Sequence, residues 1–263
     1  MHPILFEFGP IQIRYYGLMY AISILCALPL MHHEIRRKHI QLSEEDTMNF
    51  LILCVMGGIL GARLYYVIFN WESYRQELSE IFKVWHGGLA IHGGILGGVL
   101  VGWLLTRRHH IPFWRMADVA ALPLILAQTF GRFGNFMNGD AHGTITAMPW
   151  GIVFPYGPAS AGELHGKPLH PVMLYEMACN FGIFLLLWRL RKTPRKDGFL
   201  FCLYLLLYSV ARFFVSFFRA DNLMVAQLSL PHIVSILLIL GAGGWIVARR
   251  LWEAPDNATI YQT

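Results

Sequence analysis

Residues 199–217 read FLFCLYLLLYSVARFFVSF, and Arg212 is the one charged residue among them. A helix of this length rises about 28 Å, close to the ~30 Å thickness of the hydrocarbon core of a bilayer. A run of about 18 or more mainly apolar residues is typical of a transmembrane segment. The stretch therefore predicts a helix that crosses a membrane.

Six further apolar blocks lie along the chain. The composition is 56% hydrophobic and 14% charged, with a mean hydropathy of +0.47, which exceeds what a soluble domain of 263 residues can bury. We therefore predict an all-α, polytopic membrane protein with about seven transmembrane helices. The other blocks are residues 15–32, 48–70, 90–106, 117–134, 172–190 and 231–250.

Lysine and arginine are unevenly distributed over the loops between the blocks. Because cationic loops are retained in the cytoplasm, we expect the N-terminus outside and the C-terminus in the cytoplasm. The loop of about residues 135–171, between the fourth and fifth blocks, is then an external head loop. The cations of the inner loops are Arg36, Arg37, Lys38, Arg107, Arg108, Arg115, Arg189, Arg191, Lys192, Arg195, Lys196, Arg249 and Arg250, and those of the outer loops are Arg75, Lys83, Lys167 and Arg219.

The chain shows no linker, low-complexity tract or repeat, so residues 1–263 are predicted to form a single domain. The net charge of +5 comes from short clusters beside the apolar blocks, without interleaved stacking aromatics. This pattern favours contact with anionic membrane lipids over binding of nucleic acid. The four cysteines lie in apolar blocks, where they behave as small hydrophobic residues. We expect no disulfide, no metal site and no cofactor.

Glycines recur at helix-packing spacing in two blocks. Gly57 and Gly61 lie in the second block, and Gly94, Gly98 and Gly102 lie in the third. Small residues at such intervals let helix backbones approach closely. We interpret these glycines as positions of close backbone packing that belong to the scaffold.

Three arginines, Arg63, Arg132 and Arg212, lie inside apolar blocks. Each costs ~2.5–3.5 kcal/mol to insert, so each requires a partner or a function. A single arginine can reach the interface or pair with a carbonyl group, but three together favour a binding site. A polar stripe accompanies Arg212 at helical spacing and consists of Tyr208, Ser216 and Arg219.

The run GRFGNFMNGD at residues 131–140 places a guanidinium, two amides and a carboxylate at the outer end of the fourth block. Arg132 and Asn135 share a helical face, and Asn138 and Asp140 follow them. Guanidinium binds phosphate through paired hydrogen bonds. These groups therefore predict a site for the phosphate of a lipid headgroup. Since no serine or cysteine lies in a nucleophile motif, we expect the attacking group to come from a second substrate.

Two histidines, His86 and His92, flank the start of the third block. Their separation does not put them on one helical face, and no carboxylate or thiolate joins them, which disfavours a metal site. A packing role is the simplest interpretation of a single histidine. His92 is the better functional candidate, because imidazole exchanges protons near neutral pH.

The run at residues 131–140 resembles the signature of bacterial prolipoprotein diacylglyceryl transferases. Four other runs resemble the same family in the same order, so the resemblance covers nearly the whole chain. They are RYYGLMY at 14–20, GLAIHGG at 88–94, HPVMLYE at 170–176 and ARFF at 211–214.

The resemblance implies a transferase of the bacterial inner membrane, with the N-terminus and head loop in the periplasm. The family moves diacylglycerol from phosphatidylglycerol to the lipobox cysteine thiol of a preprolipoprotein signal peptide. This first step of lipoprotein maturation forms a thioether and releases glycerol phosphate. By position, Arg132, Arg212, His92 and Tyr16 would be catalytic. The residues implied in substrate binding are Arg132, Asn135, Asn138, Asp140, Gly143, Arg212 and Arg219.

Three positions depart from the family pattern. Asp140 stands where the family usually has glutamate, His86 where it often has an acid, and Ser216 where it has an acid. Without that acid, the guanidinium of Arg212 must be neutralised by another carboxylate or by the lipid. A diverged paralogue with another lipid or acceptor preference is an alternative. A transporter or channel for an anionic substrate is a second one, although the paired broken helices of inverted repeats are not evident.

Overall fold

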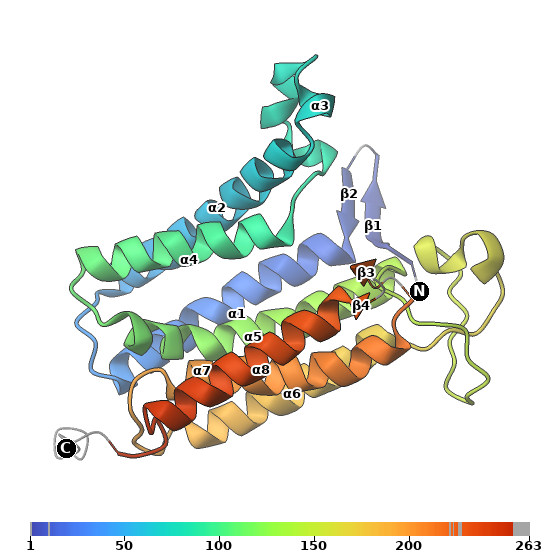
Figure 1. Ribbon diagram of the computed structural model, residues 1–263. Helices are drawn as coiled ribbons and strands as arrows, with labels where there is room; N and C mark the ends of the chain where they lie inside the picture. Colours follow the sequence, from blue (N-terminus) through green and yellow to red (C-terminus); the bar gives the residue numbers. More distant parts are fainter. Residues whose placement is uncertain (1, 10, 221, 223, 226–227, 255–263) are drawn as a thin grey trace. The chain divides into compact units, whose positions relative to one another are not determined.

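The computed structural model describes residues 2–9, 11–220, 222, 224–225 and 228–254, and helices dominate these residues (Figure 1). Each predicted apolar block overlaps one long helix. The helices are α1 (Tyr15–Arg37), α2 (Glu44–Phe69), α4 (Ile91–Arg108), α5 (Phe113–Asn138), α6 (Val172–Leu190), α7 (Phe199–Val215) and α8 (Leu230–Ala248). Helix α5 continues through Pro123 and ends four residues later than the predicted block, so Asn135 and Asn138 belong to the helix and not to the loop.

Within the described part of the chain, five helices are long and apolar enough to cross a membrane: α1, α2, α6, α7 continued to Phe218, and α8. Glycines and the terminal Arg107 and Arg108 dilute the apolar character of α4. Helix α5 is diluted by polar side chains that include Asp118 and Arg132. The chain is thus a helical, multi-pass membrane protein.

Short elements connect the long helices. An antiparallel hairpin of β1 (Ile4–Phe8) and β2 (Ile11–Arg14) precedes α1, which an all-α prediction did not include (Figure 1). The remaining elements are α3 (Trp71–Tyr74), η1 (Leu78–Phe82), η2 (Val84–His86), η3 (Pro158–Ser160), η4 (Gly162–Leu164), η5 (Ser216–Phe218), β3 (Met224–Val225) and β4 (Leu228–Ser229).

The chain divides into two compact units. One consists of Met1–Leu30 with Ala117–Thr263, and the other of Met31–Met116. In the second unit α2 and α4 pack closely through glycines. Gly57 and Gly61 of α2 have the expected close backbone contacts, but their partners on α4 are Gly93 and Gly97. A Cβ on Gly61 would lie 2.9 Å from the Cα of Gly97 and closer still to the Gly93 carbonyl oxygen, whereas Gly94 and Gly98 make only ordinary contacts of 3.5 and 3.6 Å.

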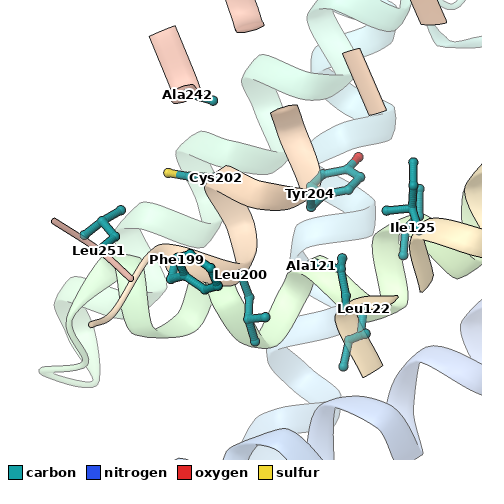
Figure 2. Close-up of a cluster of buried hydrophobic side chains, with 11 residues drawn as sticks. Ala121, Leu122, Ile125, Phe199, Leu200, Cys202, Tyr204, Ala242 and Leu251 are labelled. Carbon is teal, nitrogen blue, oxygen red and sulfur yellow. The ribbon is translucent and has the colours of Figure 1, made fainter. Parts of the chain in front are cut away.

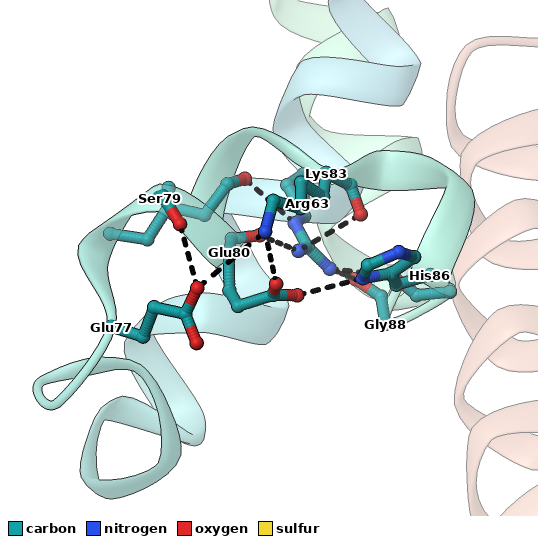
Figure 3. Close-up of polar contacts among 9 residues, drawn as sticks. Arg63, Glu77, Ser79, Glu80, Lys83, His86 and Gly88 are labelled. Atoms are coloured by element: carbon teal, nitrogen blue, oxygen red, sulfur yellow. Dashed lines mark hydrogen bonds and ion pairs between the residues drawn. The ribbon is translucent and has the colours of Figure 1, made fainter.

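Arg63 organises the loop between α2 and α4 in this unit. The residue is 5% exposed. Its Nε donates to the Ile81 carbonyl at 2.9 Å, and Nη1 donates to the Gly88 carbonyl at 3.0 Å (Figure 3). The carbonyls of Glu80, Lys83 and Gly87 also accept from this guanidinium. The buried Arg63 therefore has a structural partner set, which was the simpler of the two interpretations.

Beside Arg63 the loop is also held by the carboxylate of Glu80. Lys83 Nζ lies 2.6 Å from Oε1 and His86 Nδ1 lies 2.8 Å from Oε2 (Figure 3). Hydrogen bonds from Lys83 and then His86 lower the pKa of the Glu80 carboxyl group. His86 thus pairs within its own loop.

The core of the larger unit lies between α5, α6 and α7. Leu122 and Ile125 of α5 are fully buried against Leu200 and Tyr204 of α7 (Figure 2). Close contacts between such side chains hold helices together through dispersion forces. In a membrane this packing contributes more than the hydrophobic effect, because lipid tails are as apolar as the side chains. The packed faces of α5 and α7 fix how these two helices present their polar residues.

Asp118 sets the axial register between α5 and α7. Its two carboxylate oxygens accept hydrogen bonds from the backbone N–H groups of Gly198 and Phe201, each at 2.9 Å. These donors belong to the first turn of α7, where helix N–H groups lack partners within the helix. These two hydrogen bonds hold the start of α7 beside Asp118 of α5.

Candidate anion-binding site

Three arginines of the larger unit converge on Glu176, in the second turn of α6. Arg212 Nη1 donates to Oε1, and Arg219 Nη1 donates to the same oxygen at 2.9 Å. Arg132 Nε lies 2.6 Å from Oε2 as an ion pair, without the alignment of a hydrogen bond. The Glu176 side chain is 4% exposed, whereas those of Arg132 and Arg212 are 21% and 19% exposed. The carboxylate is therefore the buried centre of the cluster.

Helix geometry explains why Arg132 and Arg212 reach the same point. Asp118 of α5 contacts Gly198 at the start of α7. Each arginine follows its own residue of this contact by fourteen positions, and both helices run away from it. At ~1.5 Å per residue, each arginine lies about 21 Å along its helix from the contact. The two guanidiniums therefore lie at the same height.

Arg219 is placed by pairing of its backbone and not by a helix. Gly143 and Arg219 form an antiparallel bridge, and Thr144 N donates to the Phe218 carbonyl at 2.9 Å. A Cβ on Gly143 would lie 2.5 Å from the His170 carbonyl oxygen. The small size of Gly143 thus lets His170 and Val172 come close to the strand-like segment that pairs with Arg219.

The amides and the acid of the 131–140 run form a chain of hydrogen bonds to Arg132. Arg132 Nη1 donates to Asn135 Oδ1 at 3.1 Å, which confirms that the two residues share a face. Asn135 Nδ2 donates to Asp140 at 2.7 Å, and Asn138 Nδ2 donates to the other oxygen of Asp140 at 3.0 Å. Asp140 thereby orients the Asn135 amide so that its oxygen faces Arg132.

Tyr16, in the first turn of α1, lies against α5. A Cβ on Gly134 would be 3.0 Å from Tyr16 Cδ2, so a larger residue there would press on the Tyr16 ring. The Tyr16 phenol interacts electrostatically with Arg132 and Asp140. The residue therefore borders the same group of charges.

His92 lies in the other compact unit, at the second residue of α4. Its side chain is exposed, and its ring centroid is 6.0 Å from that of Tyr65. The other predicted site residues, from Tyr16 to Arg219, lie in the unit that contains Glu176. The role of His92 as a base stays a prediction.

The partner of Arg212 is a carboxylate from another helix, which was one of the two expected ways to neutralise it. Ser216 itself is 1% exposed, and its Oγ has no hydrogen-bond partner among the described residues. Glu176 lies within the HPVMLYE run and was not among the site residues predicted from the sequence. A glutamate inside an apolar block was itself a signal, because such residues need a partner as much as arginines do.

The charges and free donors of the cluster suit an oxyanion. Each guanidinium has five N–H donors, and the described contacts use Nε and Nη1 of Arg132 and Nη1 of Arg212. Arg132 and Arg212 bring two positive charges to the carboxylate of Glu176, which Arg219 also contacts. A further anion would balance this site and could accept paired hydrogen bonds.

Comparison with known proteins places this arrangement in context. Residues 3–248 match the family described as "Prolipoprotein diacylglyceryl transferase". The chain is 38% identical over 241 residues to a protein of Clostridioides difficile, covering 92% of each chain. It is 39% identical over 243 residues to one of Synechococcus elongatus, covering 90% of this chain and 83% of that protein. A Listeria welshimeri protein is 37% identical over 257 residues, covering 97% and 92%. All three are named phosphatidylglycerol--prolipoprotein diacylglyceryl transferase.

Proposed function

Because the chain belongs to the prolipoprotein diacylglyceryl transferase family, we propose that it transfers the diacylglyceryl group of phosphatidylglycerol to a prolipoprotein and binds the lipid phosphate at Arg132 and Arg212. The acceptor is the thiol of the lipobox cysteine in the signal peptide. The observation that carries the proposal is the sharing of one buried carboxylate by two partly exposed guanidiniums.

The charge of the donor lipid fits this site. A phosphodiester would bring one negative charge to Arg132 and Arg212, two partly exposed guanidiniums that share the single carboxylate of Glu176. Partial burial strengthens the attraction relative to water. The lipid phosphate therefore supplies the charge that the two arginines need.

The same groups assist the transfer itself. The thiol sulfur forms a bond to the terminal glycerol carbon of the diacylglyceryl group, and the bond from that carbon to the phosphate oxygen breaks. Its electron pair leaves with the phosphate as glycerol phosphate, and the thiol proton passes to a base. Negative charge grows on the phosphate oxygens as this bond breaks, and fixed guanidiniums stabilise it without reorganising.

His92 is the proposed acceptor of the thiol proton. A cysteine thiol has a reference pKa of ~8.5, so little thiolate exists at neutral pH. His92→Gln is expected to reduce turnover at pH 7 more than at pH 9, where thiolate is abundant. An equal reduction at both pH values would indicate a packing role instead.

The proposed topology has seven membrane spans in the bacterial inner membrane. The N-terminus and residues 139–171 are periplasmic and the C-terminus is cytoplasmic, on the support of the cation distribution. Thr193→Cys and Ser160→Cys test this with an impermeant maleimide applied to spheroplasts, with the unmodified chain and its four cysteines as the blank. Labelling at position 160 only is expected. Labelling at position 193 only would reverse the orientation.

The function is tested with purified protein, phosphatidylglycerol and a lipobox peptide. Mass spectrometry should find the peptide heavier by one diacylglyceryl group and the medium enriched in glycerol phosphate. A peptide with serine in place of the lipobox cysteine is the matched control and should stay unmodified. No adduct on the cysteine peptide would contradict the proposal and return attention to transport of an anionic substrate.

A further inference from the structure

Glu176 contacts all three arginines of the cluster. Its Oε1 accepts from Arg212 and Arg219, and its Oε2 lies beside Arg132. Among the described residues it is the only carboxylate within ion-pair distance of Arg132 or Arg212. The two guanidiniums would repel each other without it, since like charges a few ångströms apart in a partly buried site interact strongly.

Glu176 lies on a buried face of α6. Val172 and Met173, in the turn before it, are 0% exposed, and Asn180 in the turn after it is 2% exposed. Helix α6 is therefore buried above and below the carboxylate on this face. The carboxylate is thus held away from solvent, and the more exposed Arg132 and Arg212 reach it there.

We propose that Glu176 is a positioning and specificity-determining residue, which holds the guanidiniums of Arg132 and Arg212 together and limits the positive charge of the cluster. The site thereby prefers a phosphate monoanion, such as a lipid phosphodiester, to a phosphomonoester dianion. This inference rests on the proposed function, because it concerns the same phosphate site.

The substrate and the product of the reaction differ in the charge of their phosphate. Its substrate is a phosphodiester with one negative charge, and its released product, glycerol phosphate, is a phosphomonoester. A phosphomonoester gains its second charge with a pKa near 6, so it is largely a dianion at pH 8. A cluster with one more positive charge would hold the product more tightly and release it more slowly. Glu176 thus keeps the affinity for product low after the bond has broken.

Glu176→Gln tests the charge while keeping the shape of the side chain. Purified variants in mixed micelles are titrated with phosphatidylglycerol, phosphatidic acid and glycerol phosphate, and binding is measured without an acceptor peptide. At pH 8 the Gln variant should gain about tenfold in affinity for phosphatidic acid relative to phosphatidylglycerol, because one unit charge at this distance has an effect of that order. At pH 5, where both lipids are monoanions, the gain should disappear.

Two further variants separate charge from position. Glu176→Asp keeps the charge and shortens the side chain, so it should lower kcat by displacing the arginines while keeping the wild-type ratio of affinities. Ser209→Ala, the control, removes a buried hydroxyl of α7 that lies outside the ion pairs. It should change neither kcat nor the ratio of affinities. Product inhibition by glycerol phosphate should become stronger only in the Gln variant.

The proposal is overturned if Glu176→Gln has the wild-type kcat and the wild-type ratio of affinities at pH 8. Should that variant fail to fold, as shown by its melting curve, the Asp variant decides. An Asp variant with a changed ratio of affinities, or with unchanged kcat, would contradict the proposal. Failure of the proposed function reads differently, since the wild-type protein would then form no thioether while the binding measurements remain interpretable.

Discussion

Two arginine sites show how the same residue type has different purposes in one chain. Arg63 donates from all three guanidinium nitrogens to backbone carbonyls of a single loop (Figure 3). Arg132 and Arg212 instead meet one shared carboxylate, Glu176, and retain donors beyond those that the described contacts use. In both sites the partners offset the free-energy cost of placing an arginine in an apolar helix.

The two sites differ in the hydrogen-bond donors and positive charge that remain available after folding. Neutral carbonyls use up the donors of Arg63, so this residue completes a structure. A single carboxylate cannot balance two guanidiniums, so Arg132 and Arg212 attract another anion. Removing an arginine should accordingly affect the loop in one case and the chemistry in the other.

The largest effect is expected for Arg132→Ala. Turnover should fall roughly 10²–10³-fold, as is typical when a fixed donor to a developing charge is removed. Glu176 keeps Arg212 and Arg219 as partners, so the melting temperature should change little. Transfer assays and thermal unfolding in detergent measure the two quantities. Arg107→Ala, at the exposed end of α4, is the control and should retain activity. A similar loss in both variants would break the comparison.

Arg63→Met should have the opposite profile. The carbonyls of residues 80–88 would lose their shared donor, which costs about 1–3 kcal/mol for each buried group left unsatisfied. Hydrogen exchange of this loop should become faster, while turnover of the folded protein falls less than about tenfold. Slow exchange combined with lost turnover would show that Arg63 serves the reaction.

A smaller effect is expected where α2 packs on α4. Gly61→Ala would place a methyl group against the backbone of Gly93 and Gly97, and overpacking of this kind costs about 1–3 kcal/mol. Gly94→Ala has ordinary contact distances and should leave the melting temperature unchanged or slightly higher. Equal melting temperatures for the two variants would show that these helices are free to separate.

The smallest effect concerns pH and the Glu80 carboxyl group. Its pKa is lowered from 4.5 in the folded protein by Lys83 and His86. Its stabilisation is therefore present above about pH 4.5 and lost as the pH falls through the lower, folded pKa. Protection of residues 78–86 from hydrogen exchange, corrected for intrinsic rates, should fall in this acidic range. Glu80→Gln should remove the pH dependence, and identical profiles for both proteins would exclude this role.

The helices were predictable from the sequence because each one buries or presents a long apolar run. Their ends were less so. Helix α1 continues past its apolar block to Arg37, since cations at a helix C-terminus interact favourably with its dipole. The β1–β2 hairpin was missed, although Gly9 with a φ of 57° marks a turn between two short alternating segments.

The site was predictable in its parts and not in its centre. Arg132, Asn135 and Asp140 lie within one run, and helical spacing alone brings the first two together. Glu176 lies 36 residues from Arg212 in the sequence. Which helix faces which depends on lateral packing, which a single sequence without an alignment does not contain. The shared carboxylate therefore emerged only from the fold.

The most direct test of the phosphate site is the Arg212→Lys variant, with turnover and melting temperature measured on the same preparation. Lysine keeps the positive charge beside Glu176 and loses the planar, paired donors that fit a phosphate. We expect a variant that melts at the wild-type temperature and has lost most of its activity in the transfer from phosphatidylglycerol. A variant that is equally stable and fully active would contradict the assignment of Arg212 to the lipid phosphate.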